Sequence, residues 1–441
     1  MNVLGKSILG NTAKFCRNIS VSAANNTNYS CKLLVVGGGS GGCTMAAKFA
    51  RRSKAKDAVI VLEPSKDHYY QPLWTLVGAG VTDLSVSLRR EQDVLPSGAK
   101  WIQDYALSID PEACRVTTKE GHVINYEYII VAVGLVNDYK KVPGMLEALE
   151  DPNSGVSTIY SPEYSVKTWK NLQNFKGGEA IFTFPKCPVK CPGAPLKIAM
   201  LSDSYFTKTN KRSKTNMTYA TCLPVIFGVK KYADSLDKVV SRKKIKVDNN
   251  MILKEIRADK KEAVFHKCED EDNLICRPYD MMHVVPFMFA PDVISQNKLI
   301  SDELGYLDVD QFTLQHKRYE NMYGIGDCTN TPNSKTAAAI AKQSYVVERN
   351  LLSSMKNDSP KEKYDGYGAC PLVTSYNTCI LAEFVYGGVP HETFPFDQSK
   401  EHKSLYYMKR YMFPFIYWNF SLKGWYNGPE FVRSISNPFG W

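Results

Sequence analysis

Two cysteines of the sequence are candidates for redox or nucleophilic chemistry. Cys191 lies just before an expected helix at residues 194–205 and beside Lys190, and both the positive end of the helix dipole and the lysine favour the thiolate over the thiol. Cys370 lies in a loop before a strand-like segment, where a buried small apolar residue is an equally good interpretation. Most of the remaining cysteines lack any spacing typical of metal ligands, so we expect no metal site.

A glycine-rich turn near the N-terminus has the spacing of a pyrophosphate-binding loop. Residues 37–42 read GGGSGG and lie between an apolar, strand-like segment and helical sequence. Gly37 permits the tight turn, Gly39 lets the backbone approach a phosphate, and Gly42 lets the helix pack closely on the strand. Glu63 ends the next strand, 21 residues after Gly42, where a ribose-binding carboxylate is required. The pattern predicts a dinucleotide-binding unit.

Later segments add to this expected site. A strand at 100–106 would bring Ala106 to the adenine, and a buried strand at 128–134 ends at Gly134, which lets the chain turn beside a cofactor. Asp327 closes a short strand, as in two-dinucleotide flavoproteins, where this carboxylate faces the ribityl chain of FAD. A helix beginning near Lys335 would place positive charge beside a reduced flavin, although Lys335 could equally be a surface lysine.

The middle of the chain lacks a second glycine turn. After an expected strand at 180–184, residues 185–195 read PKCPVKCPGAP, so prolines and cysteines stand where a pyrophosphate loop would need backbone N–H donors. This substitution argues against a bound nicotinamide nucleotide.

Composition and charge limit the function classes. The chain has 441 residues, 44% of them hydrophobic, and a formal net charge of +10, which excludes a disordered or fibrous protein. No nucleic-acid motif accompanies the positive charge, so we expect no nucleic-acid partner. Residues 1–30 carry Lys6, Lys14 and Arg17 and no acidic residue, which is typical of a mitochondrial transit peptide.

The C-terminal segment is aromatic and basic. Residues 405–426 contain ten aromatic side chains, and Pro414 is expected to break any single helix there. The stretch between Arg410 and Lys423 is too short to cross a bilayer, so two short helices lying on a membrane surface are expected. The alternative is internal packing of these rings at a domain seam.

Several motifs, in the same order from about Cys31 to the C-terminus, resemble those of the mitochondrial sulfide:quinone oxidoreductases. They are VKCPGAP at 189–195, FGVKKYAD at 227–234, GDCTN at 326–330, YDGY at 364–367 with CPLVT at 370–374, and FPFDQSK at 394–400. The resemblance implies an α/β fold with two Rossmann-like domains and a C-terminal amphipathic region that attaches to a membrane. The expected division is a transit peptide at 1–30, the FAD-binding domain at 31–160 and 291–385, the second Rossmann-like domain at 161–290, and the membrane-attaching, quinone-site region at 386–441.

The same resemblance implies the chemistry. Sulfide would attack an oxidised Cys191–Cys370 pair, leave a persulfide on Cys370 and release the Cys191 thiolate. Electrons would pass through FAD to ubiquinone, and the sulfane sulfur to glutathione, sulfite or coenzyme A, at the surface of the mitochondrial inner membrane. The residues that the motifs and the resemblance assign to FAD are Gly37, Gly39, Ser40, Gly41, Gly42, Glu63, Gln71, Ala106, Gly134, Asp327, Lys335 and Thr336.

Other functions remain open at this point. A type II NADH:quinone oxidoreductase would share FAD and the tail but would need a second glycine turn and no reactive cysteines. A non-catalytic FAD-bearing partner protein would bind FAD without reacting with sulfide. Cys187 lies four residues before Cys191 and departs from the family pattern; it forms a local disulfide, is an extra sulfur carrier, or is an incidental small residue of the loop.

Overall fold

The computed structural model describes residues 27–53, 55 and 57–437. Residues 1–26 of the leader predicted at residues 1–30 lie outside the described residues. Residues 28–30 already belong to the first strand, β1 (Asn28–Val36), where they pair with β8 (Val123–Val131). The folded part of the chain therefore begins before the expected boundary at Cys31.

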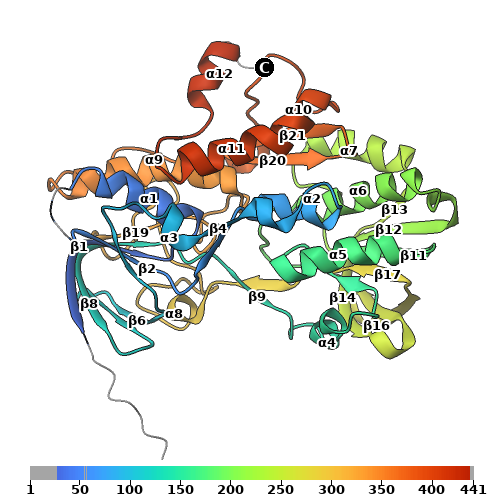
Figure 1. Cartoon of the computed structure of the whole chain (residues 1–441), viewed down its shortest axis with the longest axis horizontal. Coiled ribbons are helices and arrows are strands. Elements are labelled where there is room, and N and C mark those ends of the chain that lie inside the picture. Colours follow the sequence, from blue (N-terminus) through green and yellow to red (C-terminus); the bar gives the residue numbers. More distant parts are fainter. Residues whose placement is uncertain (1–26, 54, 56, 438–441) are drawn as a thin grey trace, which may run out of the picture.

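The first sheet presents the glycine turn at the end of a central strand. Its order is β5-β2-β1-β8-β7-β6, with β19 pairing with the end of β8, and β5, β2, β1, β8 and β19 run parallel (Figure 1). The carboxyl ends of parallel strands meet at one edge, so the turns after β1, β8 and β19 lie together. The remaining strands of this sheet are β2 (Val59–Leu62), β5 (Lys100–Ile102), β6 (Ala106–Asp110), β7 (Arg115–Thr118) and β19 (Met322–Gly324).

The second sheet is parallel throughout, in the order β10-β17-β11-β12-β13. Its strands are β10 (Val156–Ser157), β11 (Gly178–Phe184), β12 (Thr215–Thr221), β13 (Ile245–Asp248) and β17 (Met281–His283). The helices that precede, connect and follow its strands are α4 (Met145–Glu150), α5 (Pro162–Asn174), α6 (Ala194–Lys208) and α7 (Lys230–Arg242). The expected helix after Cys191 is α6.

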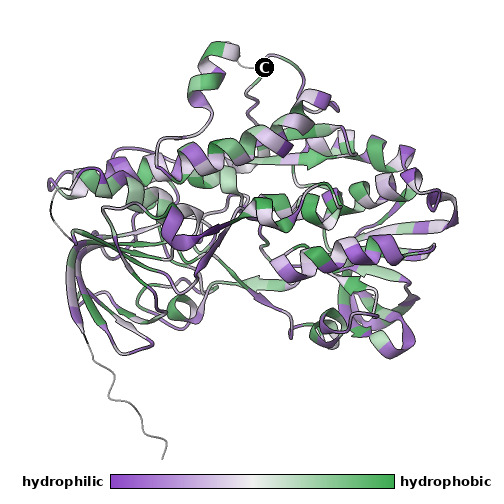
Figure 2. Ribbon diagram, viewed as in Figure 1, coloured by the Kyte–Doolittle hydropathy of each residue, from purple (hydrophilic) through white to green (hydrophobic). Residues whose placement is uncertain are grey.

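Smaller elements connect and cover the two sheets. The antiparallel strands are β3 (Asp67–Tyr69) with β4 (Leu88–Arg90), β9 (Val136–Asp138) with β18 (Phe287–Phe289), β14 (Met251–Arg257) with β15 (Glu262–Lys267) and β16 (Asp270–Pro278), and β20 (Gly368–Val373) with β21 (Cys379–Val385) and β22 (Val389–Pro390). The remaining helices before the tail are α1 (Ser40–Ala50), α2 (Trp74–Gly78), α3 (Glu91–Val94), α8 (Asp292–Ser295) and α9 (Ala337–Ser354). Figure 2 shows hydrophobic residues along the strands of both sheets, while α5 is largely hydrophilic.

The tail forms one winding helical segment rather than two separated helices. It runs through α10 (Lys403–Tyr407), the π-helical turn η6 (Met408–Met412), α11 (Phe413–Ile416) and a second π-helical turn, η7 (Tyr417–Ser421), and α12 (Glu430–Ser436) follows. The expected break at Pro414 is therefore wrong. In the π turn Phe413 donates to the Met408 carbonyl five residues back, and this wider winding accommodates a proline ring that would clash in a regular α-helix. Among the described residues no helix has the length and apolarity to cross a membrane.

Candidate active site

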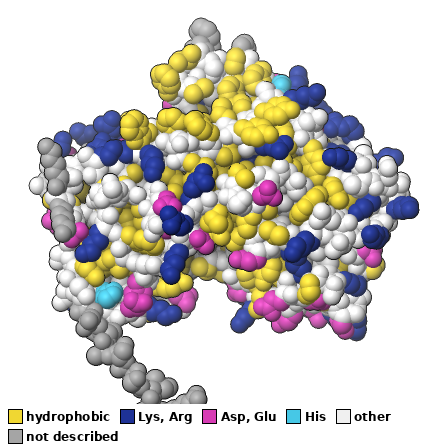
Figure 3. Space-filling model, in the orientation of Figure 1, with side chains coloured by type: hydrophobic (Ala, Val, Ile, Leu, Met, Phe, Trp, Pro, Cys, Tyr) yellow, Lys and Arg dark blue, Asp and Glu magenta, His cyan; other side chains and the backbone are white. Residues whose placement is uncertain are grey.

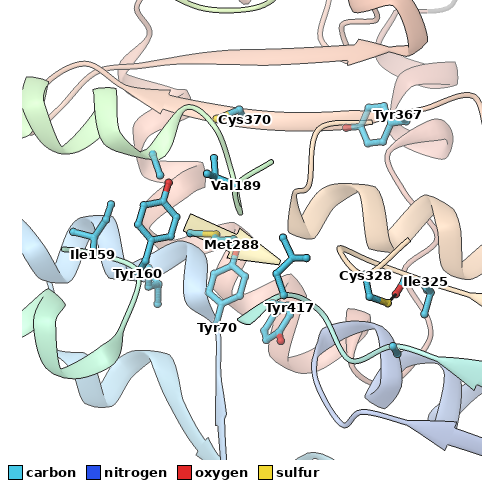
Figure 4. Packing of buried hydrophobic residues seen from close by; sticks show 14 of the residues in the cluster. Tyr70, Ile159, Tyr160, Val189, Met288, Ile325, Cys328, Tyr367, Cys370 and Tyr417 are labelled. Atoms are coloured by element: carbon cyan, nitrogen blue, oxygen red, sulfur yellow. Dashed lines mark hydrogen bonds between the residues drawn. The ribbon is translucent and has the colours of Figure 1, made fainter. Parts of the chain in front are cut away.

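The structure brings Cys191 and Cys370 together although 179 positions separate them in sequence. Cys191 lies in the loop after β11, and Cys370 lies inside β20 rather than in a loop. Their Sγ atoms are 3.4 Å apart, compared with about 2.05 Å in a disulfide, so the pair stands as two thiols within contact distance. Cys370 is completely buried (Figure 4), whereas Cys191 is partly exposed to neighbouring cavities.

A buried lysine controls the charge of this pair. Lys197, in the first turns of α6, donates to Cys191 Sγ at 3.2 Å and to Cys370 Sγ at 3.6 Å. The hydrogen bond from Cys370 and the nearby Lys197 charge hold the pKa of Cys191 well below its usual value, against the effect of burial. The pKa of Cys370 is raised well above its usual value, first by its hydrogen bond with Cys191 and then by burial. Cys191 is therefore the thiolate of the pair.

The sequence assigned this electrostatic role to the wrong lysine. Lys190 lines the cofactor cavity described below and interacts with Asp327, and burial lowers its pKa. Lys197 is the cation in contact with both sulfurs. A signal for it exists in the sequence, because Lys197 is the sole charged residue in the otherwise apolar stretch 194–201.

The backbone at Cys191 is also unusual. Its φ is +51°, a left-handed conformation that costs a non-glycine residue roughly 1–2 kcal/mol. The Cys191 N–H donates to the Lys335 carbonyl at 2.7 Å, which fixes the loop to the segment before α9. Because this donor is used internally, the proline-rich loop offers less to a pyrophosphate than a glycine turn does.

A cavity of about 370 Å³ lies where the strand ends of the first sheet meet the Cys191 loop. It gathers most of the residues predicted to hold a dinucleotide. The predicted residues in its wall are Gly39, Ser40, Gly41, Glu63, Gln71, Gly134, Asp327, Lys335 and Thr336, and Cys191 lies there too.

The glycine turn fits a closely approaching phosphate. A Cβ on Gly42 would lie 1.8 Å from the Gly37 carbonyl oxygen, so the turn itself needs glycine there. A Cβ on Gly39 would meet no atom within 4 Å, which leaves the backbone bare toward the cavity. Trp74 supplies a further sign of a missing ligand, since it lines this cavity and its buried indole Nε1 has no hydrogen-bond partner.

Charged residues and a helix end also face the cavity. Glu63 accepts from Gly38 N at 2.6 Å and from Ser65 N at 2.7 Å, and burial raises its pKa despite these bonds. Burial also raises the pKa of Asp327, while Lys335 and Lys190 oppose that rise. Thr336 caps α9 by accepting from Ala339 N, so the positive end of this helix faces the cavity.

Three of the predicted cofactor residues do not line the cavity. Gly37 and Gly42 lie within the turn behind it. Ala106 is the first residue of β6, four residues after the end of β5 at Ile102, and it is not among the residues that line the cavity. Its place at the adenine therefore stays a prediction.

A second, mainly apolar cavity of about 200 Å³ lies between the tail and the cysteine pair. It shares Cys191, Lys197, Thr336 and Ala337 with the first cavity, so the two adjoin at the thiolate. The tail encloses it with Met408, Lys409, Met412, Phe413, Ile416 and Tyr417. The Nζ of Lys409 donates to the Pro72 carbonyl at 2.8 Å, and burial with the neighbouring Lys197 lowers the pKa of Lys409 to about 8.

A third and larger cavity, of about 700 Å³, opens on the other side of the Cys191 loop. Lys186, Cys187 and Pro192 line it together with Phe227 and Lys335. Only a thin wall separates it from Cys370, because a Cβ on Gly193 would lie 2.6 Å from Cys370 Sγ and 3.5 Å from the Phe227 ring.

The fold and this site define a pyridine nucleotide-disulphide oxidoreductase-like flavoprotein, and the model of the family described as "Pyridine nucleotide-disulphide oxidoreductase" matches residues 31–172. A mouse (Mus musculus) protein named mitochondrial sulfide:quinone oxidoreductase is 50% identical over 92% of this chain and 89% of its own length. A Dictyostelium discoideum protein of the same name is 40% identical over 92% of this chain and 89% of its own length. The chain belongs to the sulfide:quinone oxidoreductase family. The crystal structure of the Aquifex aeolicus enzyme of that name shares the fold, with a TM-score of 0.75 at 19% identity over 93% of this chain and 95% of that one.

Proposed function

We propose that this protein oxidises hydrogen sulfide and passes the electrons to a quinone. The observation that carries the proposal is the Cys191–Cys370 pair, with sulfurs 3.4 Å apart and Lys197 on both, at the junction of a dinucleotide cavity and an apolar cavity. A type II NADH:quinone oxidoreductase or a non-catalytic flavoprotein would need no such pair.

The cysteines carry the sulfur chemistry from their disulfide state. Hydrosulfide attacks Cys370 Sγ, the S–S bond breaks, and its electron pair leaves on Cys191, so sulfide is oxidised while the disulfide is reduced. Lys197 stabilises the departing Cys191 thiolate, in accord with the low pKa of this thiol. An acceptor anion then takes the outer sulfur of the Cys370 persulfide, which leaves both cysteines reduced.

The cofactor cavity completes the electron path. FAD, when bound, would supply a two-electron carrier between the reduced pair and a quinone. Gly39, Ser40 and Gly41 would hold its pyrophosphate, and Glu63 its ribose. Gln71, Gly134, Asp327, Lys335 and Thr336 would line the space for the remainder of the molecule, and Gly37 and Gly42 shape the turn.

The two other cavities accommodate the remaining reactants. The cavity beneath the tail suits the ring of ubiquinone because its wall is mainly apolar. It also adjoins the cofactor cavity, since Cys191 and Thr336 line both. The larger cavity, which has Lys186 and Lys335 in its wall, gives an anionic acceptor such as sulfite, glutathione or coenzyme A an approach to the Cys370 sulfur.

The tail provides attachment to a membrane surface. Apolar side chains stay exposed along it, with Phe415 at 59%, Trp425 at 68% and Phe431 at 77%. Figure 3 shows hydrophobic side chains gathered over this end of the molecule, with lysines and arginines beside them. This arrangement suits the headgroup region of a bilayer, and the inner mitochondrial membrane is the bilayer that we propose for it; the names of the two relatives, which include the word mitochondrial, support that organelle.

The division of the chain follows the same functions. Residues 31–160 and 291–385 form the FAD domain, residues 161–290 the domain carrying Cys191, and residues 386–441 the quinone and membrane region. The two larger sheets support this division in outline, since β1, β2, β5 to β8 and β19 form one sheet and β11, β12, β13 and β17 lie in the other. Strand β10 (Val156–Ser157) also joins the second sheet, although its residues precede the boundary at 160.

Anaerobic titration of the detergent-solubilised holoenzyme tests the proposal. Sulfide should bleach the flavin absorbance, a quinone should restore it, and Cys191→Ser and Cys370→Ser should both abolish the bleaching. Cys187→Ser is the matched control, because Cys187 lies four residues from Cys191 but lines only the acceptor-side cavity. Bleaching by NADH, or by sulfide in both serine variants, would overturn the proposal.

A further inference from the structure

Tyr417 differs from most aromatic residues of the tail because it points inward. It is 5% exposed, whereas Tyr411 is 56% exposed on the same segment. Its ring lies 4.3 Å from the Tyr70 ring, centroid to centroid, and forms part of the wall of the apolar cavity (Figure 4).

The hydroxyl of Tyr417 reaches the cofactor-binding turn. It lies 2.7 Å from Ser40 Oγ and 2.6 Å from His68 Nε2. Ser40 is the first residue of α1 and follows the bare backbone of Gly39, so its hydroxyl stands at the positive end of the helix where a phosphate would bind.

His68 extends the contact beneath the turn. Its Nδ1 lies 3.0 Å from Glu91 Oε2, and both residues are buried. Glu91 in turn lies against the glycine turn, because a Cβ on Gly38 would be 2.5 Å from Glu91 Oε1. A continuous polar chain therefore runs from Ser40 through Tyr417 and His68 to Glu91.

We propose that Tyr417 is a positioning residue for the FAD pyrophosphate, so that docking of the tail and retention of the cofactor depend on each other. Its phenol orients the Ser40 hydroxyl toward the cavity and holds His68 and Glu91 under the turn, while its ring forms the quinone-cavity wall. This inference rests on the FAD site assigned above.

The hydrogen bonds of the Tyr417 hydroxyl determine how strongly its removal should affect FAD release. A phenol can donate one hydrogen bond and accept others, so it satisfies Ser40 and His68 at once. Replacing it with phenylalanine leaves His68 Nε2 unpaired in a buried site and frees the Ser40 hydroxyl to rotate. A buried polar group without a partner is costly, so we expect FAD release to be about tenfold faster.

The test compares FAD release from the holoenzymes of wild type and Tyr417→Phe, followed by the recovery of free-flavin fluorescence after dilution. The matched control is Tyr411→Phe, which should release FAD at the wild-type rate. Wild-type release from Tyr417→Phe would overturn the inference while leaving sulfide oxidation intact. Wild-type protein that binds no FAD at all would instead overturn the proposed function.

A double-mutant cycle separates positioning from general destabilisation. Ser40→Ala alone should also speed FAD release, and adding Tyr417→Phe should then have a smaller effect than it has in the wild-type background, because Tyr417 acts partly through Ser40. Independent, fully additive effects would show that Tyr417 only stabilises the fold and would refute the positioning role.

Discussion

Lys197→Met removes the cation that contacts both sulfurs while keeping an unbranched side chain in its place. The Lys197 Nζ lies 3.2 Å from Cys191 Sγ. Two unit charges about 4 Å apart interact by roughly 4 kcal/mol at an effective dielectric constant of about 20, and one pKa unit corresponds to about 1.4 kcal/mol. Lys197 also lowers the pKa of Lys409, so its removal lets Lys409 become more fully protonated and offset part of the loss, and we expect the pKa of Cys191 to rise by about two units rather than three.

The pH dependence of Cys191 alkylation measures this change. The holoenzyme, reduced with dithiothreitol, is treated with iodoacetamide across a pH series, and modification of the Cys191 peptide is followed by mass spectrometry. Only the thiolate reacts, so a raised pKa moves the midpoint of the rate profile to higher pH.

Lys190→Met provides the contrast, because Lys190 is the neighbour that the sequence suggested. Its amine interacts with Asp327, and no hydrogen bond to either sulfur is found for it among the described residues. The midpoint of the Cys191 alkylation profile in Lys190→Met should stay within about half a pH unit of the wild-type midpoint. An unmoved midpoint in Lys197→Met, or an equal movement in both variants, would refute the assignment of Lys197.

Two further predictions concern the turn and the tail. Gly42→Ala should destabilise the whole protein, because its Cβ would lie 1.8 Å from the Gly37 carbonyl oxygen, whereas Gly39→Ala should keep the thermal stability of the apoprotein and lose FAD affinity; equal unfolding midpoints in the two apoproteins would contradict this. The double variant Phe415→Ser with Trp425→Ser should bind phospholipid vesicles at least about tenfold more weakly in sedimentation assays, because burying each ring in the membrane contributes about 1.5–3 kcal/mol to the free energy of binding. Leu304→Ser, at a residue 81% exposed outside the tail, should leave vesicle binding unchanged, and a similar loss there would point to nonspecific adsorption.

The predicted residues that line the cofactor cavity were all identified from local sequence motifs or from the family resemblance. The glycine turn, Glu63 and Asp327 each follow a strand of one parallel sheet, and such a sheet brings its strand ends to one edge whatever the intervening length of chain. Ala106 follows the end of β5 by four residues and does not line the cavity, so its role at the adenine stays a prediction.

The remaining site residues were out of reach because their partners lie far along the chain. Tyr417 meets Ser40 across 377 positions, and Lys409 meets Pro72 across 337. Aromatic composition indicated that the tail seeks an apolar environment, and both interpretations of it apply: Tyr417 packs inside while Phe415 stays exposed. Which side chains of the tail are buried and which are exposed depends on the two π turns. Their wider winding rotates the following side chains away from the positions that a regular α-helix would give them.

The conformation of the loop after β11 explains both why the loop has no glycine turn and why the Cys191 thiol lies beside Cys370. The loop after β11 is pinned by Cys191 N to the Lys335 carbonyl, and this contact holds Cys191 in its left-handed conformation beside Cys370. The same contact joins the loop to the start of α9, whose capping residue Thr336 lines both the cofactor and the apolar cavity. A glycine turn at this place would keep its N–H groups free for a pyrophosphate and would withdraw the thiol from the junction. Under the proposed function, this loop can therefore place either a nicotinamide nucleotide or the Cys191 thiolate beside the flavin cavity, and the bond from Cys191 to Lys335 favours the thiolate.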